Sequence, residues 1–371
     1  MGAETLSDVG ELGTQYVKSK GFALLDRFPA LQALPRAPLG AFPSPVERVI
    51  AGGHELWLKR DDRNAPVAAG NKVRALEFLL GPVRAGDLVL AVGGEGSTHV
   101  YATAVHAERL GARTAAIRWA HAMHPVSRAV ARAIEHHCVS DTRSRWVVGA
   151  LAQATAWRIA ARVSGGRRHY LPPGGSNPLG VLGHMDAGLE LAGQIADGLL
   201  PAPTHVVVPL GTGGTVAGLA LGLGGGGVAT TVVAVRVAPW PVANLYRVHA
   251  LIRRTRRLVR RFEGRNVELP AAPVVVEHSA YGGEYGRPLA AGASVAAQMR
   301  RGVIEAGGEP VALDATYAAK AAVVALALAA SPDTRATEPR VLLWVTFDGR
   351  PFADETGSRI ADARFVRVGK N

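Results

Sequence analysis

The segment from Leu56 to Leu80 constrains the fold of this chain more strongly than any other stretch. Residues 56–58 alternate as a short β-strand does and end in the charged run KRDD, after which a turn-rich loop follows. Apolar residues then recur at helical spacing, with Arg74 and Glu77 on the other face. Lys72 therefore lies where a loop enters a helix.

A lysine at that position suits the chemistry of a reactive amine. The positive end of the helix dipole and burial beside the helix both lower the pKa of a lysine. The neutral amine is the form that makes a Schiff base with a carbonyl group. On spacing alone, however, a solvated first-turn lysine is the commoner case, because most lysines are exposed. The pattern around Lys72 leaves both interpretations open.

Length and composition limit the class of protein. A chain of 371 residues predicts two domains, or one large domain with an inserted lobe. No apolar run reaches the roughly eighteen residues of a membrane-spanning helix, and residues 1–20, interpreted as an extra N-terminal arm, lack the apolar stretch of a signal peptide. The single cysteine, Cys138, fits a reducing cytoplasm and is interpreted as a small buried hydrophobe.

The net charge of +12 includes one dense run of arginines over residues 253–261. A basic helix can follow phosphates, but no aromatic residues interleave with the run, so a solvated helix face is favoured over nucleic-acid binding. Within residues 120–170, four histidines lie near one another in sequence without the carboxylate or cysteine partners of a metal site. We therefore interpret these as surface histidines and expect no metal: His121, His124, His136 and His137.

Two glycine-rich turns separate a strand from a helix. An apolar strand at 87–92 leads through GGEGSTH to a helix at 100–110, and a strand at 114–119 follows. This alternation favours a parallel sheet with helices on both faces. The hydroxyl groups of Ser97 and Thr98 lie with backbone amides at the helix N-terminus, where a carboxylate would bind.

The second turn predicts a phosphate site. A buried strand at 205–210 is followed by Gly211–Thr215 and a helix at 216–223. Successive amides and the helix dipole favour an anion at such a turn, which is neither a Walker loop nor a dinucleotide fingerprint. The proline-rich residues 21–46 are expected to run extended over a surface.

Several motifs together resemble one family. KRDD followed by GNKVRALEFLL, then PPGGSNPLG, GTGGT, YGGEYGRP and LDATYAAK, resemble the D-cysteine desulfhydrase / 1-aminocyclopropane-1-carboxylate (ACC) deaminase family. Matching runs recur from Phe42 to Phe352. These are fold-type II pyridoxal 5'-phosphate (PLP) enzymes related to the tryptophan synthase β subunit. The resemblance implies an α/β fold with two open, twisted, mainly parallel sheets and helices on both faces. It implies a large PLP-binding domain of residues 1–74 and 173–371, with 75–172 as the small domain.

The resemblance also implies roles for individual residues. The lysine of GNK carries PLP in the family, and Lys72 matches it. Tyr285 and Tyr317 match two active-site tyrosines, and Ser97 matches a serine assigned to proton transfer. Ser97, Thr98 and His99 correspond to the loop that grips the substrate carboxylate. The residues expected to bind the cofactor are Lys72, Asn71, Thr98, Gly211, Thr212, Gly213, Gly214, Thr215 and Thr346.

The sequence departs from the family pattern at informative positions. Thr98 replaces an asparagine that contacts the phenolic oxygen of the cofactor. Ala318 stands where ACC deaminases have a glutamate at the pyridine nitrogen and desulfhydrases have serine or threonine. Thr346 resembles the desulfhydrases and is a candidate for the pyridine nitrogen instead. The tyrosine motifs are separated by more residues than usual, and the excess is assigned to a turn at 300–308.

We therefore expect a PLP-dependent lyase or deaminase that acts on a small amino acid, as D-cysteine desulfhydrase does, by α,β-elimination to a 2-oxo acid and ammonia. One alternative is a diverged enzyme that performs β-replacement or racemisation in a specialised biosynthetic pathway. Another is a catalytically inactive binding protein with the same fold. A cytoplasmic homodimer without nucleic-acid or membrane partners is expected, while the substrate and its chirality stay open.

Overall fold

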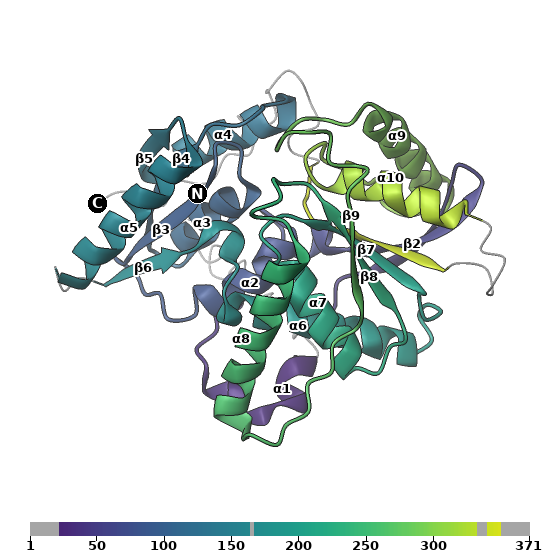
Figure 1. Ribbon diagram of the computed structural model, residues 1–371, viewed down its shortest axis with the longest axis horizontal. Helices are drawn as coiled ribbons and strands as arrows, with labels where there is room; N and C mark the ends of the chain where they lie inside the picture. Colours follow the sequence, from purple (N-terminus) through teal and green to yellow (C-terminus); the bar gives the residue numbers. More distant parts are fainter. Residues whose placement is uncertain (1–21, 164–166, 332–339, 350–371) are drawn as a thin grey trace, which may run out of the picture.

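Two sheets form the framework of the protein (Figure 1). The structure, a computed structural model, describes residues 22–163, 167–331 and 340–349. The larger sheet has the strand order β1 (Val46–Ala51), β2 (His54–Arg60), β10 (Val341–Val345), β7 (His205–Leu210), β8 (Thr231–Arg236) and β9 (Val274–Glu277). The smaller sheet has the order β5 (Cys138–Ser144), β4 (Arg113–Trp119), β3 (Leu88–Gly94) and β6 (Arg168–Leu171).

Helices lie between and around these strands. They are α1 (Ala23–Arg27), α2 (Asn71–Leu79), α3 (Thr98–Arg109), α4 (Pro125–His137), α5 (Val147–Val163), α6 (Pro178–Ala196), α7 (Gly214–Gly225), α8 (Leu245–Glu263), α9 (Ala290–Glu305) and α10 (Ala318–Ala329). Short 3-10 turns occupy Pro29–Ala33 (η1), Asp61–Arg63 (η2) and Pro173–Gly175 (η3). In the part of the chain that the structure describes, no helix is long and apolar enough to cross a membrane.

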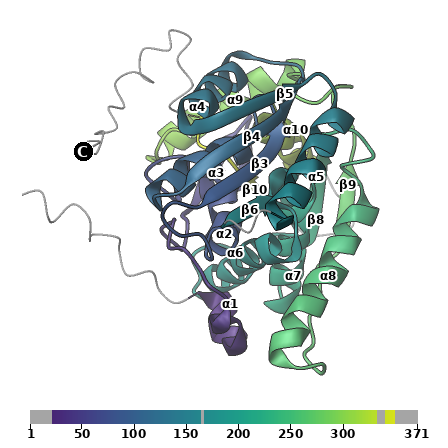
Figure 2. The ribbon, with the colours of Figure 1, turned by 90° about the vertical axis from the view of Figure 1, so that its left-hand side faces the viewer.

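Both sheets are mainly parallel and are covered on both faces. Only the β1–β2 hairpin is antiparallel among the named strands. In the large sheet, alternate residues of β7 divide between two cores, so that Val206 packs with α6 and α7 and Val207 packs with α9 and α10. In the small sheet, Val89 of β3 packs with α3 and α4, whereas Leu90 packs with α5 (Figure 2). The predicted fold class is confirmed.

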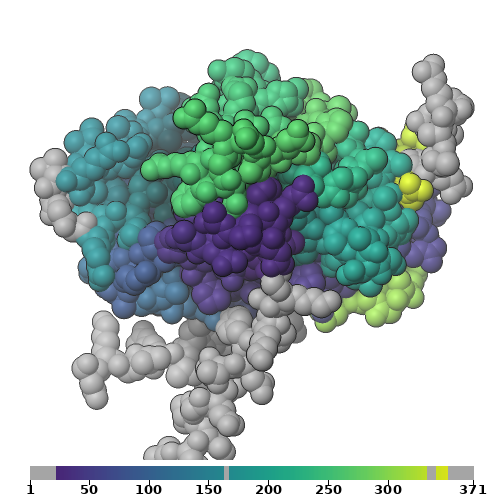
Figure 3. Space-filling view, turned by 90° about the horizontal axis from the view of Figure 1, so that it is seen from below, coloured from purple at the N-terminus to yellow at the C-terminus, as the bar shows by residue number. Residues whose placement is uncertain are grey.

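Some local expectations are wrong. Residues 21–46 are not extended throughout, because α1 and η1 form there, and Leu31 donates its amide to Glu263 of α8 at 3.2 Å. Figure 3 shows this N-terminal segment lying beneath α8. The expected turn at 300–308 is mostly helix, since α9 continues to Glu305. The arginine run lies on α8 and its cations are largely exposed, as the solvated-face interpretation predicts.

The domain boundaries remain a prediction. The expected small domain, 75–172, contains the whole four-stranded sheet and α3 to α5. The proposed arm at 1–20 and the end of the large domain at 350–371, which includes Phe352, lie outside the described residues.

A network of buried charges connects the segment from Leu56 to Leu80 with its neighbours. The Arg74 guanidinium donates to Asp61 at 2.8 Å and to Glu190 at 2.9 Å, and Lys59 also donates to Glu190. Although burial opposes it, Arg74 and Lys59 lower the pKa of Glu190 to about 2. Trp344 of β10 donates its indole N–H to Asp61 at 2.8 Å. The prediction that Arg74 lies on an exposed face of α2 is therefore wrong: Arg74 is as buried as the apolar side. It joins α2 to η2 and α6, and through Asp61 to β10.

We predict that Arg74→Met lowers the free energy of unfolding by about 3–5 kcal/mol, because it leaves two buried carboxylates without their main cation. Urea denaturation followed by circular dichroism measures the change. The control is Arg48→Met, which breaks the exposed pair between Arg48 and Glu55 and should cost under about 1 kcal/mol. Equal losses for the two variants would show that the network carries no special share of the stability.

Candidate active site

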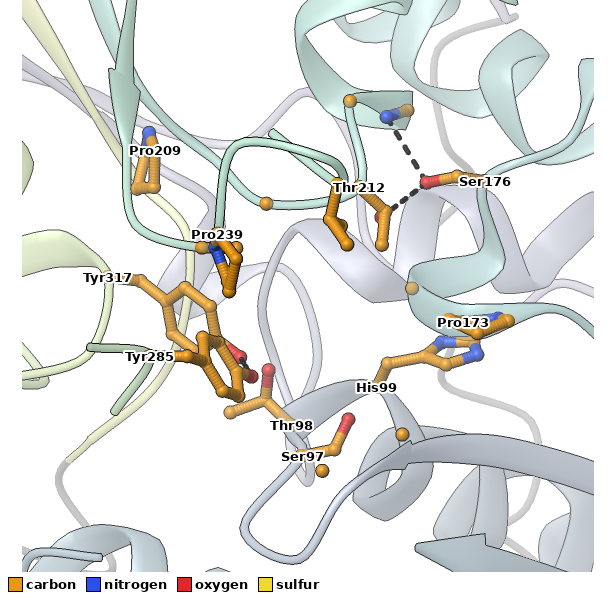
Figure 4. A pocket seen from close by; sticks show the side chains of 18 of the residues that line it. Ser97, Thr98, His99, Pro173, Ser176, Pro209, Thr212, Pro239, Tyr285 and Tyr317 are labelled. Carbon is orange, nitrogen blue, oxygen red and sulfur yellow. Dashed lines mark hydrogen bonds between the residues drawn. The ribbon is translucent and has the colours of Figure 1, made fainter. Parts of the chain in front are cut away.

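A cavity of about 730 Å³ lies between the two sheets. Residues at or after the carboxyl ends of β3, β4, β7, β8 and β10 contribute to its wall. Open parallel sheets bind ligands at this edge, because the helices that follow the strands begin there and present their amides and positive dipole ends. Figure 4 shows side chains from both sheets pointing toward the shared space. The expected site residues all lie on the cavity wall, which is lined by Asn71, Lys72, Ser97, Thr98, His99, Gly211, Thr212, Gly213, Gly214, Thr215, Tyr285, Tyr317 and Thr346.

Lys72 lies in the first turn of α2, as its sequence position predicts. The turn before it depends on Gly70, whose φ of +137° is available to glycine and whose added Cβ would lie 2.6 Å from the carbonyl oxygen of Thr346. Asn71 donates its amide to that same oxygen at 3.0 Å. Lys72 is half-buried, and burial lowers its pKa to about 8. Its amine is thus far easier to deprotonate than that of a solvated lysine.

The phosphate-type turn lies on the same cavity. Helix α7 begins at Gly214, and its N-cap is Gly213, whose φ is +91°. Because glycine has no side chain, no side-chain hydrogen bond from the N-cap closes the start of α7. The Gly214 amide donates to Ser176 Oγ at 3.2 Å, and Ser176 also bonds to Thr212 at 2.6 Å (Figure 4). Thr215 accepts a hydrogen bond from the Asn71 side chain at 2.8 Å. The turn and the lysine helix are therefore joined directly.

Ser176 is a site residue that the sequence analysis did not single out. It belongs to the PPGGSNPLG loop, which the sequence contributed only as one of the motifs that resemble the family. The signal was available, since that loop precedes a helix and resembles a family motif. The loop needs its glycines: a Cβ on Gly174 would lie 2.2 Å from Thr212 Oγ1. Ser176 thus holds the phosphate-type turn in shape from the neighbouring loop.

The residues present fit PLP. The cofactor carries a phosphate and an aldehyde, and the cavity offers a helix N-terminus of glycines and small hydroxyl residues together with an amine of lowered pKa. A Cβ on Gly211 would meet no atom within 4 Å, so the turn leaves open space for an anion. No group of three metal-ligating side chains occurs in the described residues.

The opposite wall is the N-terminus of α3. Ser97 is its N-cap and accepts from the Val100 amide at 3.4 Å, and Thr98 follows, nearly buried. His99 is buried next to the lysine. Burial and then the charge of Lys72 lower the pKa of His99 to about 3, so its ring is neutral at physiological pH. The wall therefore offers hydroxyl groups, amides and a neutral imidazole.

Two tyrosines from the large sheet's side complete the inner cavity. The hydroxyl groups of Tyr285 and Tyr317 are hydrogen-bonded to one another and point into the space above Ser97 and Thr98 (Figure 4). Burial raises the pKa of Tyr285 to about 12 and that of Tyr317 well above its usual range. Asp314 accepts from the Tyr317 amide at 2.7 Å and so fixes that residue's backbone. Both phenols keep their protons and can donate them.

The surface interpretation of two histidines is wrong. His121 lines the cavity: its Nε2 accepts from the Gly96 amide at 3.1 Å, and its ring centroid lies 4.7 Å from that of Tyr285. His124 is buried and bonds to Thr316 Oγ1 at 2.7 Å. Spacing could not reveal these contacts, although His121 follows the carboxyl end of β4, where a parallel sheet places its binding loops.

The departures from the family pattern fall at defined places. Ala318 is fully buried in the first turn of α10 and is not among the residues that line the cavity. Thr346 does line it, directly after β10. A hydroxyl group from Thr346 remains the predicted partner of the pyridine nitrogen.

A half-buried lysine of lowered pKa and a phosphate-type turn at a helix N-terminus, on one cavity between two parallel-rich sheets, define the class of fold-type II PLP enzymes. The comparisons place the chain within it. Residues 38–336 match the family model for pyridoxal-phosphate dependent enzymes, and the chain belongs to that family. Its cofactor is pyridoxal 5'-phosphate.

Named relatives come from the expected group and from one further activity. Nocardicin C-9' epimerase of Nocardia uniformis subsp. tsuyamanensis is 39% identical over 214 residues, 55% of this chain and 64% of that protein. D-cysteine desulfhydrase of Klebsiella pneumoniae subsp. pneumoniae is 33% identical over 214 residues, 54% of this chain and 61% of that protein. The chain thus aligns with less than two thirds of either relative. A crystal structure of an ACC deaminase homologue superposes with a TM-score of 0.69 at 25% identity, covering 90% of this chain and 98% of that one.

We predict that borohydride reduction of the PLP-loaded protein attaches the cofactor to Lys72, as peptide mass mapping will show. Lys320 is the matched control, because burial also lowers its pKa to about 8, but its amine donates to the Tyr281 carbonyl at 2.7 Å and does not line the cavity. Lys72→Ala should lose the adduct and Lys320→Met should keep it. An adduct on Lys320 in the unaltered protein contradicts the assignment.

The pH dependence of cofactor attachment provides a separate prediction. With a pKa of about 8, the neutral fraction of Lys72 rises about tenfold per pH unit below pH 7 and levels off above pH 8. The rate at which the cofactor-free protein takes up PLP, followed by absorbance, should have the same profile. A rate that keeps rising beyond pH 9 would be that of an ordinary lysine and would rule out the lowered pKa.

Proposed function

We propose that this protein is a PLP-dependent lyase or deaminase that removes the α-proton of an amino acid and then eliminates a β-substituent, after which water hydrolyses the unsaturated amine to a 2-oxo acid and ammonia. One observation carries the proposal: the amine of Lys72, with its pKa lowered to about 8, shares a cavity with Ser97 and with the protonated pair Tyr285–Tyr317. A base, a hydroxyl group and proton donors are the groups that such a reaction needs.

Each wall has a separate task in this proposal. The amides of Gly211–Thr215 bind the phosphate, and Ser176 keeps that turn in position. When bound, PLP withdraws electrons from the substrate's Cα, which makes the Cα proton acidic. The Lys72 amine accepts that proton. Ser97, Thr98 and His99 bind the substrate carboxylate at the N-terminus of α3, where the helix dipole favours an anion.

In this proposal the tyrosine pair protonates the leaving group. Neither phenol ionises near neutral pH, because burial raises both pKa values. The hydrogen bond between them lets a proton given up by one be replaced from the other. The substrate of the expected reaction, a small amino acid such as D-cysteine, would lose sulfide at this position.

Epimerisation or racemisation is a second candidate. In this candidate, Lys72 in α2 and Ser97 at the N-cap of α3 handle protons from different walls, so that one would take a proton from one face of Cα and the other would return one to the opposite face. The relative named an epimerase gives this candidate further support.

A β-replacement would use the same first step. The departures at Thr98 and Ala318 motivate the rival from another class, a PLP-fold protein without catalysis.

One experiment separates these reactions. The PLP-loaded protein is incubated in deuterated water with D- and L-amino acids, including D-cysteine, and the 2-oxo acid, ammonia and Cα deuterium are measured. Elimination yields the 2-oxo acid and ammonia. Racemisation yields deuterated substrate of inverted configuration without a 2-oxo acid. If neither product forms with the amino acids tested, elimination and racemisation are contradicted, and β-replacement and the binding-protein alternative are left. Dimer formation and a cytoplasmic location remain predictions.

We predict that Tyr285→Phe lowers the turnover number at least about 100-fold, because a proton donor at the leaving group is lost. The exposed Tyr246, which does not line the cavity, provides the control Tyr246→Phe, expected to leave turnover within twofold of the unaltered protein, roughly the range of neutral surface substitutions. Steady-state kinetics on the best substrate provide the comparison. Unchanged turnover in Tyr285→Phe would remove that phenol from the reaction.

A further inference from the structure

The cavity extends beyond the residues that serve the cofactor and the amino-acid group. Five apolar residues of its lining, from both sheets' sides, serve neither role, and we term them the outer wall: Trp119, Val147, Leu151, Pro239 and Val242. None of the five carries a group for acid–base chemistry or for binding an anion. The charged residues Arg247 and Glu284 line the cavity as well. The inner residues suffice for the carboxylate, the amine and a short side chain, so the outer wall requires a different explanation.

One side of the outer wall is the exposed face of α5. Val147 and Leu151 are one helical turn apart, and 41% and 40% of their surfaces are exposed. The sheet-facing side of the same helix is occupied by Ala150 and Ala154, which are buried. Apolar side chains gathered at the mouth of a cavity characterise ligand sites, since they lose contact with water when a ligand enters.

The other side is the connection between β8 and α8. Val242 donates its amide to the Pro239 carbonyl at 2.9 Å, and the side chain of Asn244 donates to the Trp240 carbonyl at 2.7 Å. Asn244 also caps α8 by accepting from the Arg247 amide. These bonds hold Pro239 and Val242 in a formed turn, so this side of the outer wall exists before any ligand arrives.

We propose that the substrate is larger than D-cysteine: its β-substituent continues as an extended apolar group, ending in an aromatic ring or a comparable group, which lies along the outer wall. The inference rests on the proposed function, because the inner cavity must hold the amino-acid end. Continuity of the outer wall with that inner cavity favours the substrate's own side chain as the occupant. An aromatic end suits Trp119 and the aliphatic residues opposite it, which offer flat and apolar contact.

The test uses ligands of one series: the D and L forms of alanine, norvaline, phenylalanine and homophenylalanine. Their dissociation constants are measured on the PLP-loaded protein from the shift of its absorption band. We expect affinity to rise roughly two- to fourfold per added methylene along the outer wall. Leu151→Asp should weaken homophenylalanine at least about tenfold and leave alanine unchanged.

The matched control is Val148→Asp on the same helix. Val148 is 78% exposed and does not line the cavity, so this change adds the same charge without touching the outer wall. It should leave every affinity as it is. Equal effects of the two variants, or affinities that do not depend on side-chain length, would overturn the inference.

Two further outcomes have distinct meanings. If alanine shifts the band and longer ligands bind no better, the proposed function stands and this inference fails. If no amino acid shifts the band, both fail. Sedimentation of Leu151→Asp tests whether a second copy of the chain occupies the outer wall instead. A dimer that dissociates in this variant but not in Val148→Asp would assign the outer wall to the contact between copies. That result would also overturn the proposal.

Discussion

The pairing of two buried cations with two buried carboxylates is the interaction on which the site depends. Four charges withdrawn from water are tolerated only when they are paired and hydrogen-bonded, and Lys59, Arg74, Asp61 and Glu190 satisfy one another in this way. Arg74 lies two residues after Lys72 on α2. The network therefore fixes the backbone that carries Lys72, while the amine itself lies on the cavity side, where burial alone accounts for its lowered pKa.

The cavity side has the opposite electrostatic character. Burial holds the His99 ring and both tyrosine hydroxyl groups in their neutral forms, as the directions of their pKa shifts show. The inner walls thus rely on dipoles more than on fixed charges. In the proposed function, anions bind to the amides at the beginnings of α3 and α7, which cannot titrate. A site built in this way keeps its binding groups unchanged while protons move through the few groups that can transfer them.

Features formed by neighbouring residues could be predicted from the sequence, whereas contacts between residues distant in the chain could not. Strand, glycine turn and helix are adjacent in the chain, so the turns at Ser97 and Gly213 could be located from pattern and resemblance. The burial of Arg74 could not, because its partner Glu190 is distant in sequence and charge at helical spacing normally indicates a solvated face. His121 was missed for the same reason: its place beside Tyr285 arises only when the two sheets meet.

The position of β10 has a consequence for how the chain becomes functional. This strand comes last among the described elements, yet it lies between β2 and β7, and the carbonyl of Thr346 just after it accepts the amide of Asn71. During synthesis on the ribosome, β2 and β7 emerge long before the strand that separates them. The turn that presents Lys72 can be completed only after Thr346 has emerged. A partly made chain thus cannot hold its reactive amine in the finished geometry, and competence for the cofactor arrives with the last strand.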